Sequence, residues 1–188
     1  MNTPGFVEEV IDSMKTAGFD LKDYIRDIPD WPKKGILFRD ITPLLGDSEA
    51  LKVAIGALCE PFAQSGVEYV AAVEARGFIF GSAVAEKLGA GFIPIRKHGK
   101  LPYKTHSVTY DLEYGTDTLE VHSDAVSAGA KVLMVDDLLA TGGTMAAACE
   151  LIEKIGAEVV GATFLIELTD LHGRDKISGR TISTILTL

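Results

Sequence analysis

The chain has 188 residues, of which 47% are hydrophobic and 24% are charged, and its formal net charge at pH 7 is −9. A chain of this length can bury a full hydrophobic core, so we expect a single domain over residues 1–188. The negative balance argues against a nucleic-acid partner, which needs a basic face, and no apolar run is long enough to span a membrane.

The amino-terminal residues lack the basic start and apolar block of an export signal, which favours a cytoplasmic protein. Amphipathic patterns predict short helices over residues 6–17 and 20–28. The only cysteines, Cys59 and Cys149, fall in stretches of helical periodicity, which favours two buried thiols over a disulfide or a metal pair. The four histidines are too scattered to form a metal motif.

A covering helix is predicted over residues 49–66, followed by the first of two strand, loop and helix units. In this unit an apolar strand at residues 69–73 leads through Glu74-Ala75-Arg76-Gly77 into a helix that ends at Leu88. A second strand follows at residues 92–95. Both strands are nearly continuous apolar runs, which is typical of strands buried on both faces of a parallel sheet.

The segment at residues 98–126 differs in composition from both units. It is polar and aromatic, its residues favour β-strands, and glycine and proline interrupt it. It predicts a hairpin, and a connection of this length usually carries a lid or a binding loop. Arg96, Lys97 and Lys100 form a positive cluster at its start with no acid among them. On its own, such a cluster is explained more simply as solvated surface charge than as a binding site.

The second unit runs from an apolar strand at residues 132–135 through a loop to a helix at residues 144–155 and a strand at residues 159–168. The two units together predict an α/β fold with a parallel sheet core flanked by helices. In such sheets ligands bind beyond the carboxyl ends of the strands, where both loops lie.

The string VLMVDDLLATGGT at residues 132–144 combines two functions at that edge. Its glycines, its threonine hydroxyls and the following helix N-terminus suit a phosphate group. Asp136 and Asp137 would repel a phosphate, but they suit sugar hydroxyls or a divalent cation that the ligand carries. A phosphorylated sugar fits both halves, and the alternative is a helix cap with a tight turn. No Walker loop or G-x-G-x-x-G motif is present.

Five strings resemble, in order and spacing, the adenine-specific members of the type I phosphoribosyltransferase family. They are IPDWPKKGILFRDITPLL, EARGFIFG, IRKHGKLP, YDLEYG and VLMVDDLLATGGT. The resemblance implies the type I phosphoribosyltransferase fold, in which a small N-terminal hood (about residues 24–45) and a flexible lid loop and hairpin (about residues 97–120) join the parallel sheet core.

The implied activity is that of a glycosyltransferase (a pentosyltransferase) in purine salvage. It moves the phosphoribosyl group of phosphoribosyl pyrophosphate to adenine and gives AMP and pyrophosphate. The resemblance also implies Mg²⁺ as cofactor, held through the substrate and not directly by the protein, and a homodimer. Catalysis would be mainly electrostatic, since positive charge builds on the ribose while negative charge builds on the pyrophosphate.

The resemblance assigns the phosphoribosyl pyrophosphate site residue by residue. Ala140 to Thr144 would bind the 5-phosphate, the two aspartates the ribose hydroxyls, and the cationic residues the pyrophosphate. The full set is Arg76, Arg96, Lys97, Lys100, Asp136, Asp137, Ala140, Thr141, Gly142, Gly143 and Thr144. A non-proline cis peptide is expected at Glu74–Ala75.

Two catalytic residues are implied, Arg76 and Glu113, of which Glu113 would be the general acid/base at the purine. Tyr114 would belong to the lid. By position alone, Arg76 could be an exposed base at a helix start, Glu113 an exposed strand residue and Tyr114 a hairpin aromatic.

The implied adenine site consists of Leu37, Phe38 and Arg39. Phe38 would stack on the purine, while backbone groups near the other two would read its edge. Phe38 as plain core is the alternative. Lys34 and Trp31 depart from the proline and phenylalanine that are common in the family, and the tail from residue 176 matches it poorly.

Three rival interpretations remain. A regulator that senses phosphoribosyl pyrophosphate and binds DNA should carry an added basic segment, which the sequence does not show. A sister enzyme would act on hypoxanthine, guanine or xanthine. The third rival, an inactive binding module, is opposed by the presence of Glu113, Arg76 and both aspartates.

Overall fold

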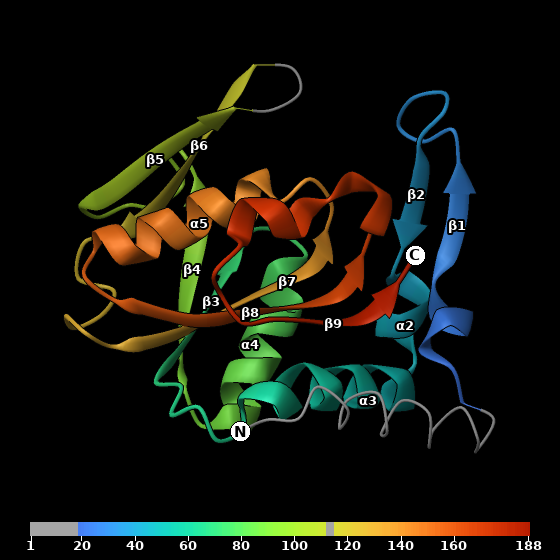
Figure 1. The fold of residues 1–188 in the computed structure, drawn as a ribbon, viewed down its shortest axis with the longest axis horizontal. Coiled ribbons are helices and arrows are strands. Elements are labelled where there is room, and N and C mark those ends of the chain that lie inside the picture. Colours follow the sequence, from blue (N-terminus) through green and yellow to red (C-terminus); the bar gives the residue numbers. More distant parts are fainter. Residues whose placement is uncertain (1–18, 112–114) are drawn as a thin grey trace.

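The computed structural model describes residues 19–111 and 115–188 (Figure 1). Its main sheet has seven strands in the order β5-β6-β4-β3-β7-β8-β9. The parallel strands are β3 (Tyr69–Val73), β4 (Gly91–Lys97), β7 (Lys131–Leu139), β8 (Glu158–Glu167) and β9 (Ile182–Thr187). The hairpin of β5 (Thr105–Asp111) and β6 (Thr116–His122) joins antiparallel to β4. The predicted α/β class with a parallel core is confirmed.

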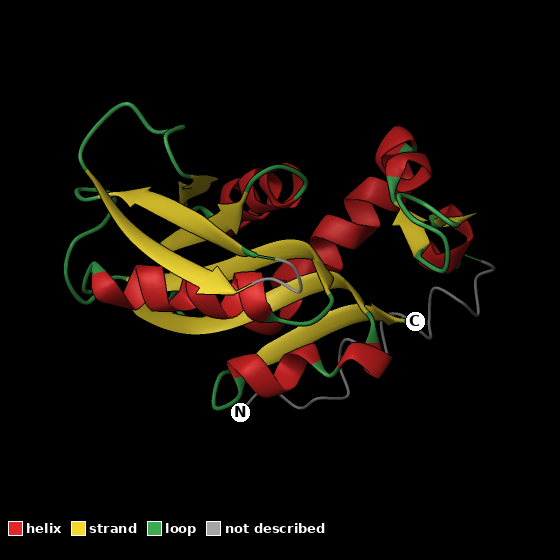
Figure 2. Cartoon of the chain, turned by 90° about the horizontal axis from the view of Figure 1, so that it is seen from above, coloured by secondary structure: helices red, strands yellow, loops and turns green. Residues whose placement is uncertain are grey.

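Both faces of the sheet are covered by helices, as Figure 2 shows from above. On one face Val132 and Met134 of β7 pack with α5 (Gly143–Lys154). On the other face Leu133 and Val135 pack with α3 (Ser48–Cys59) and α4 (Gly77–Leu88). All four β7 side chains are fully buried. Successive residues of one strand thus serve two cores, which explains the unbroken apolar run in the sequence.

The hood is a separate two-stranded antiparallel sheet of β1 (Arg26–Pro29) and β2 (Leu37–Asp40), followed by α2 (Thr42–Gly46). The helix predicted over residues 20–28 is therefore wrong. Only the short 3-10 helix η1 (Leu21–Tyr24) forms there, because the next residues pair with β2 and tertiary pairing overrides a weak helical pattern. The helix predicted over residues 6–17 lies outside the described residues.

The remaining short elements connect the layers. They are the 3-10 helices η2 (Glu60–Phe62), η3 (Thr169–Leu171) and η4 (Gly173–Ile177). The tail beyond η4 forms the outer strand β9, which pairs parallel to β8 and buries Ile185 and Leu186. In Figure 1 the strands β5 and β6 and the loop between β1 and β2 stand apart in the upper part of the molecule.

Candidate functional site

The two aspartates lie within β7, whereas the sequence analysis ended this strand at Val135. Pairing with β8 continues to Leu139, which lies opposite Glu167 and is buried. β7 is longer than predicted because its last residues remain paired with β8. The loop is therefore reduced to Ala140–Gly142, and α5 begins at Gly143.

Asp136 lies against the start of α4. A Cβ atom on Gly77 would be 2.7 Å from the Asp136 Oδ1 atom, so this close approach requires a glycine. Burial and the neighbouring Asp137 carboxylate raise the pKa of Asp136 well above its ordinary value. Burial also raises the pKa of Asp137, although Arg76 opposes it. The pair therefore favours a ligand that donates hydrogen bonds or carries positive charge.

Arg76 connects the main sheet to the hood. Its Nη2 atom is 2.9 Å from the Asp137 Oδ2 atom, and its guanidinium carbon lies 5.2 Å from the centroid of the Phe38 ring. Trp31 packs edge-on against the same ring, with a centroid distance of 4.4 Å. One side chain thus spans from the predicted adenine residues to the predicted ribose residues.

The three predicted adenine residues occupy β2. Leu37 is exposed, Phe38 is partly covered by Arg76 and Trp31, and the Arg39 guanidinium pairs with the Asp27 carboxylate across the hood. Phe38 is therefore a partly exposed ring at the inner side of the hood and not part of either buried core.

The predicted cationic cluster is brought together by Glu74, at the end of β3. The Glu74 carboxylate pairs with Lys100 Nζ at 2.9 Å and Arg96 Nη2 at 3.3 Å, and it accepts a bond from the Lys97 backbone N–H at 2.7 Å. The Lys97 ammonium pairs with Asp117 of β6 at 2.9 Å. The sequence analysis found no acid in this cluster, because its acids come from neighbouring strands. The expected cis peptide at Glu74–Ala75 is present.

The loop before α5 packs tightly on the segment after β8. A Cβ atom on Gly142 would overlap the Gly173 carbonyl oxygen, and one on Gly173 would overlap the Ala140 carbonyl oxygen. The Thr144 hydroxyl donates to the Tyr110 hydroxyl of β5 at 3.3 Å. Thr141 is the exposed member of the loop.

The site thus includes residues that the sequence analysis did not select. Tyr110 opens the YDLEYG string, so the resemblance held a signal for it. The segment of Gly173 and Lys176 carries no such sequence signal, because no pattern in the tail indicates a phosphate site. Glu113 and Tyr114 lie outside the described residues. The strand before them ends at Asp111, whose carbonyl oxygen is 3.8 Å from the position of a Cβ atom on Gly143.

The structure also bears on the expectations about membrane spans, metal ligands and cysteines. Over residues 19–111 and 115–188, no helix is long and apolar enough to cross a membrane. In the same part of the chain, no group of three or more His, Cys, Asp or Glu side chains is arranged to hold a metal ion. Both cysteines are buried free thiols.

Comparison with known proteins gives a consistent result. A family model described as "Phosphoribosyl transferase domain" matches residues 49–185. The adenine phosphoribosyltransferase of Methylococcus capsulatus is 57% identical over 166 residues, covering 88% of this chain and 97% of that protein. The crystal structure of the Rhodothermus marinus adenine phosphoribosyltransferase is 50% identical with a TM-score of 0.87, covering 94% and 99% of the two chains. The Saccharomyces cerevisiae enzyme, crystallised with an imino-altritol bisphosphate and adenine, is 38% identical with a TM-score of 0.84, covering 93% and 99%.

Proposed function

Because the chain belongs to the family of phosphoribosyl transferase domains, we propose that the carboxyl ends of β3 and β7, together with the hood, form its active site. The chain transfers the phosphoribosyl group of phosphoribosyl pyrophosphate to adenine, giving AMP and pyrophosphate. The observation that carries the site assignment is the double contact of Arg76 with Phe38 and Asp137, because it joins the base side to the sugar side.

The sugar phosphate would bind along β7 and the start of α5. The free N–H groups at the α5 N-terminus, the Thr141 hydroxyl and the Thr144 hydroxyl would hold the 5-phosphate. Asp136 and Asp137 would accept hydrogen bonds from the ribose hydroxyls. Adjacent, partly uncompensated carboxylates suit this task, since each has acceptor capacity and Arg76 is the one cation beside them among the described residues.

The leaving pyrophosphate would lie on the side of Glu74. Two cations, Arg96 and Lys100, share the Glu74 carboxylate there, which leaves a surplus of positive charge for a developing anion. Arg76 would join them, since it follows Glu74 by two residues in the same loop and its guanidinium pairs with Asp137.

We also propose that the reaction uses Mg²⁺, which the substrate carries into the site. The aspartate pair fits a cation carried by the substrate, because burial and mutual repulsion make added positive charge favourable beside it. Mg²⁺ would neutralise the negative charge that builds on the leaving pyrophosphate. The protein itself would bind the sugar, orient it and exclude water around it.

Adenine would stack on Phe38 between the hood and the main sheet, with backbone groups of Leu37 and Arg39 near its edge. Glu113 would take or share the proton of the purine imidazole ring as the opposite nitrogen attacks. Tyr114 would help close the lid.

The test is to mix the purified chain with phosphoribosyl pyrophosphate and each purine base separately, with Mg²⁺ or with a chelator. We expect AMP from adenine, little product from oxo-purines, and loss of activity with the chelator. Replacing Asp136 and Asp137 together by Asn should lower kcat/KM by about 10²-fold or more, since each carboxylate makes charge-assisted hydrogen bonds.

Glu158→Gln is the matched control for this experiment, because Glu158 is exposed at the opposite end of β8. It should leave activity unchanged. Product from hypoxanthine or guanine in place of adenine would identify a sister enzyme, and full activity of the Asn pair would refute the ribose role of the aspartates.

A homodimer and a cytoplasmic location complete the proposal. The dimer follows from the resemblance, and light scattering should give twice the chain mass of 20.1 kDa. The two buried free thiols support a reducing compartment. A monomeric mass, or recovery of the chain in an exported fraction, would contradict these two parts.

A further inference from the structure

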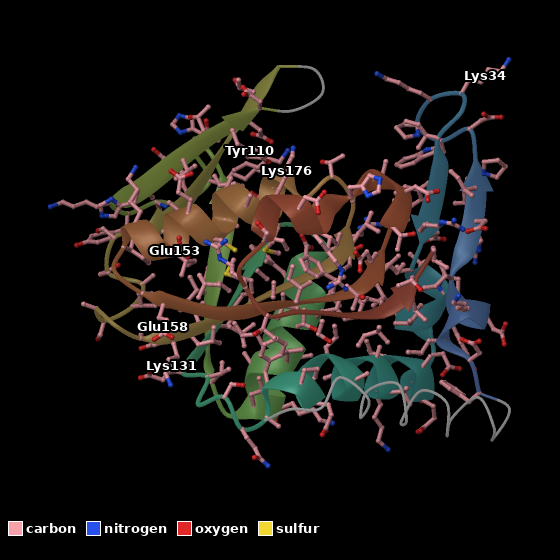
Figure 3. All side chains as sticks on the ribbon, in the orientation of Figure 1. Lys34, Tyr110, Lys131, Glu153, Glu158 and Lys176 are labelled. Carbon is pink, nitrogen blue, oxygen red and sulfur yellow. The ribbon has the colours of Figure 1, made fainter. Side chains whose placement is uncertain are left out.

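Lys176 places an ammonium group at the start of α5. Its Nζ atom lies 3.8 Å from the position that a Cβ atom on Gly143 would take. The residue is exposed, and its ammonium has no hydrogen bond or ion pair with another residue in the part of the chain that the structure describes. Figure 3 labels it together with Tyr110, whose hydroxyl accepts the hydrogen bond of Thr144 in the first turn of α5. Among the described residues, Lys176 is thus a cation without a partner beside the loop of residues 140–142, the proposed phosphate loop.

The position of Lys176 is fixed by its neighbours in η4. Gly173 packs its backbone directly on Ala140 and Gly142 of the phosphate loop. Arg174 forms a two-pronged pair with the buried Glu167 carboxylate, at 2.6 Å from Nε and 2.7 Å from Nη2. Ile177 is fully buried. A segment anchored on both sides of Lys176 holds the stem of this side chain at the loop.

The charge balance at the loop calls for such a cation. A 5-phosphate would arrive with about two negative charges and would lie near Asp136 and Asp137. The other cations of the site already have acidic partners, since Arg76 pairs with Asp137, Lys97 with Asp117, and Arg96 and Lys100 with Glu74. Without Lys176, the groups that meet the 5-phosphate at this loop would be backbone N–H groups and hydroxyls, because the surplus positive charge of Arg96 and Lys100 lies on the pyrophosphate side.

We propose that Lys176 binds the 5-phosphate of phosphoribosyl pyrophosphate and of AMP, as the cationic member of the phosphate loop. The proposal rests on the proposed function of that loop and adds a residue from outside the VLMVDDLLATGGT string. The role is in binding and not in proton transfer or bond cleavage. A lysine suits it, because an ammonium acts as a point charge on a flexible stem and can follow the phosphate.

The test compares the affinities of wild type, Lys176→Ala and Lys176→Arg for AMP and for adenosine, measured by calorimetry, with the KM for phosphoribosyl pyrophosphate. Lys131→Ala is the matched control. It makes the same change in net charge at an exposed position at the opposite end of β7, also labelled in Figure 3.

We expect Lys176→Ala to weaken AMP binding and raise the KM for phosphoribosyl pyrophosphate by about tenfold or more, which is the usual effect of a lost charge-assisted hydrogen bond. Adenosine binding should stay unchanged because it has no phosphate. Lys176→Arg should recover most of the affinity, and the loss should shrink at high salt.

Two failures are distinguishable. Wild type that neither binds nor makes AMP would overturn the proposed function and this inference together. Wild type that binds AMP, with Lys176→Ala equal to Lys131→Ala, would overturn the inference alone. Equal losses for AMP and adenosine would also overturn it, because they would indicate a structural effect and not a phosphate contact.

Discussion

At the scale of single residues, Glu74 organises the cationic side of the site. Its side chain is only 10% exposed and accepts hydrogen bonds from Lys100, from the Lys97 backbone and from Arg96. Burial acts to raise its pKa, but these donors outweigh burial and lower the pKa to about 2. The carboxylate therefore stays ionised and keeps two cations in place before a ligand arrives.

We expect Glu74→Gln to lower the free energy of unfolding at neutral pH. The folded-state pKa of about 2 lies below the ordinary value of 4.5, so the ionised carboxylate contributes stability above pH 4.5. That contribution is lost as the pH falls from 4.5 toward about 2. Urea unfolding of both proteins should therefore give a difference at neutral pH that shrinks at about pH 3.

The control for Glu74 is Glu49→Gln. The Glu49 side chain is 70% exposed and lies 3.9 Å from Lys52, so its loss should change stability little at any pH. A difference between Glu74→Gln and wild type that does not depend on pH would contradict the role of the charge.

At the scale of elements, the phosphate loop depends on a segment about 30 residues further along the chain. Gly142 has a φ of 77°, so the loop itself needs a glycine there. Gly173 packs directly against the loop, and this close approach leaves no room for a side chain beside the Ala140 carbonyl. Loop shape is therefore a joint property of the β7–α5 connection and of η4.

Replacing Gly173 by Ala should disturb both stability and binding. The added methyl group would overlap backbone atoms, which cannot rotate away, so we expect a loss of about 1–3 kcal/mol in the free energy of unfolding. The KM for phosphoribosyl pyrophosphate should rise as the loop shifts, while adenosine affinity changes less. Thermal unfolding and steady-state kinetics measure the two effects.

Gly46→Ala is a suitable comparison for Gly173→Ala. A Cβ atom at Gly46 meets no atom within 4 Å, so this variant reports the general effect of replacing a glycine. If both variants behaved alike, the packing of η4 on the loop would not control its shape.

The elements differ in how far the sequence predicted them. The buried strands were predicted well, because a strand buried on both faces is an unbroken apolar run that needs no knowledge of its neighbours. The pairing of β1 with β2 was missed because residues 20–28 also fit a weak helical pattern. The extension of β7 to Leu139 was missed because it depends on β8, a partner strand more distant in the sequence. The acidic partner of Arg96 and the position of Lys176 beside the loop also involve segments distant in sequence, so sequence patterns did not predict them.

At the scale of the whole molecule, one sheet divides the interior into two cores. Cys59 lies in the core with α3 and α4, and Cys149 lies in the core with α5. Both thiols are buried, and burial raises the pKa of each to about 11. Each cysteine is thus an unreactive reporter on its own face of the sheet, because the thiolate is the reactive form.

The two cores share every central strand, since neighbouring residues of β7 point into opposite cores. Neither face can lose its packing without exposing the strands that the other face needs, so we expect the two cores to open as one cooperative unit. Cys59→Ala and Cys149→Ala each leave a single thiol whose labelling rate can be followed across denaturant concentrations. The free energies of opening from the two variants should converge, after correction for the stability of each variant, on the value from global unfolding. Substantially easier labelling of Cys149 would instead mean that α5 detaches alone, and that the phosphate loop at its N-terminus is ordered only while the helix is docked.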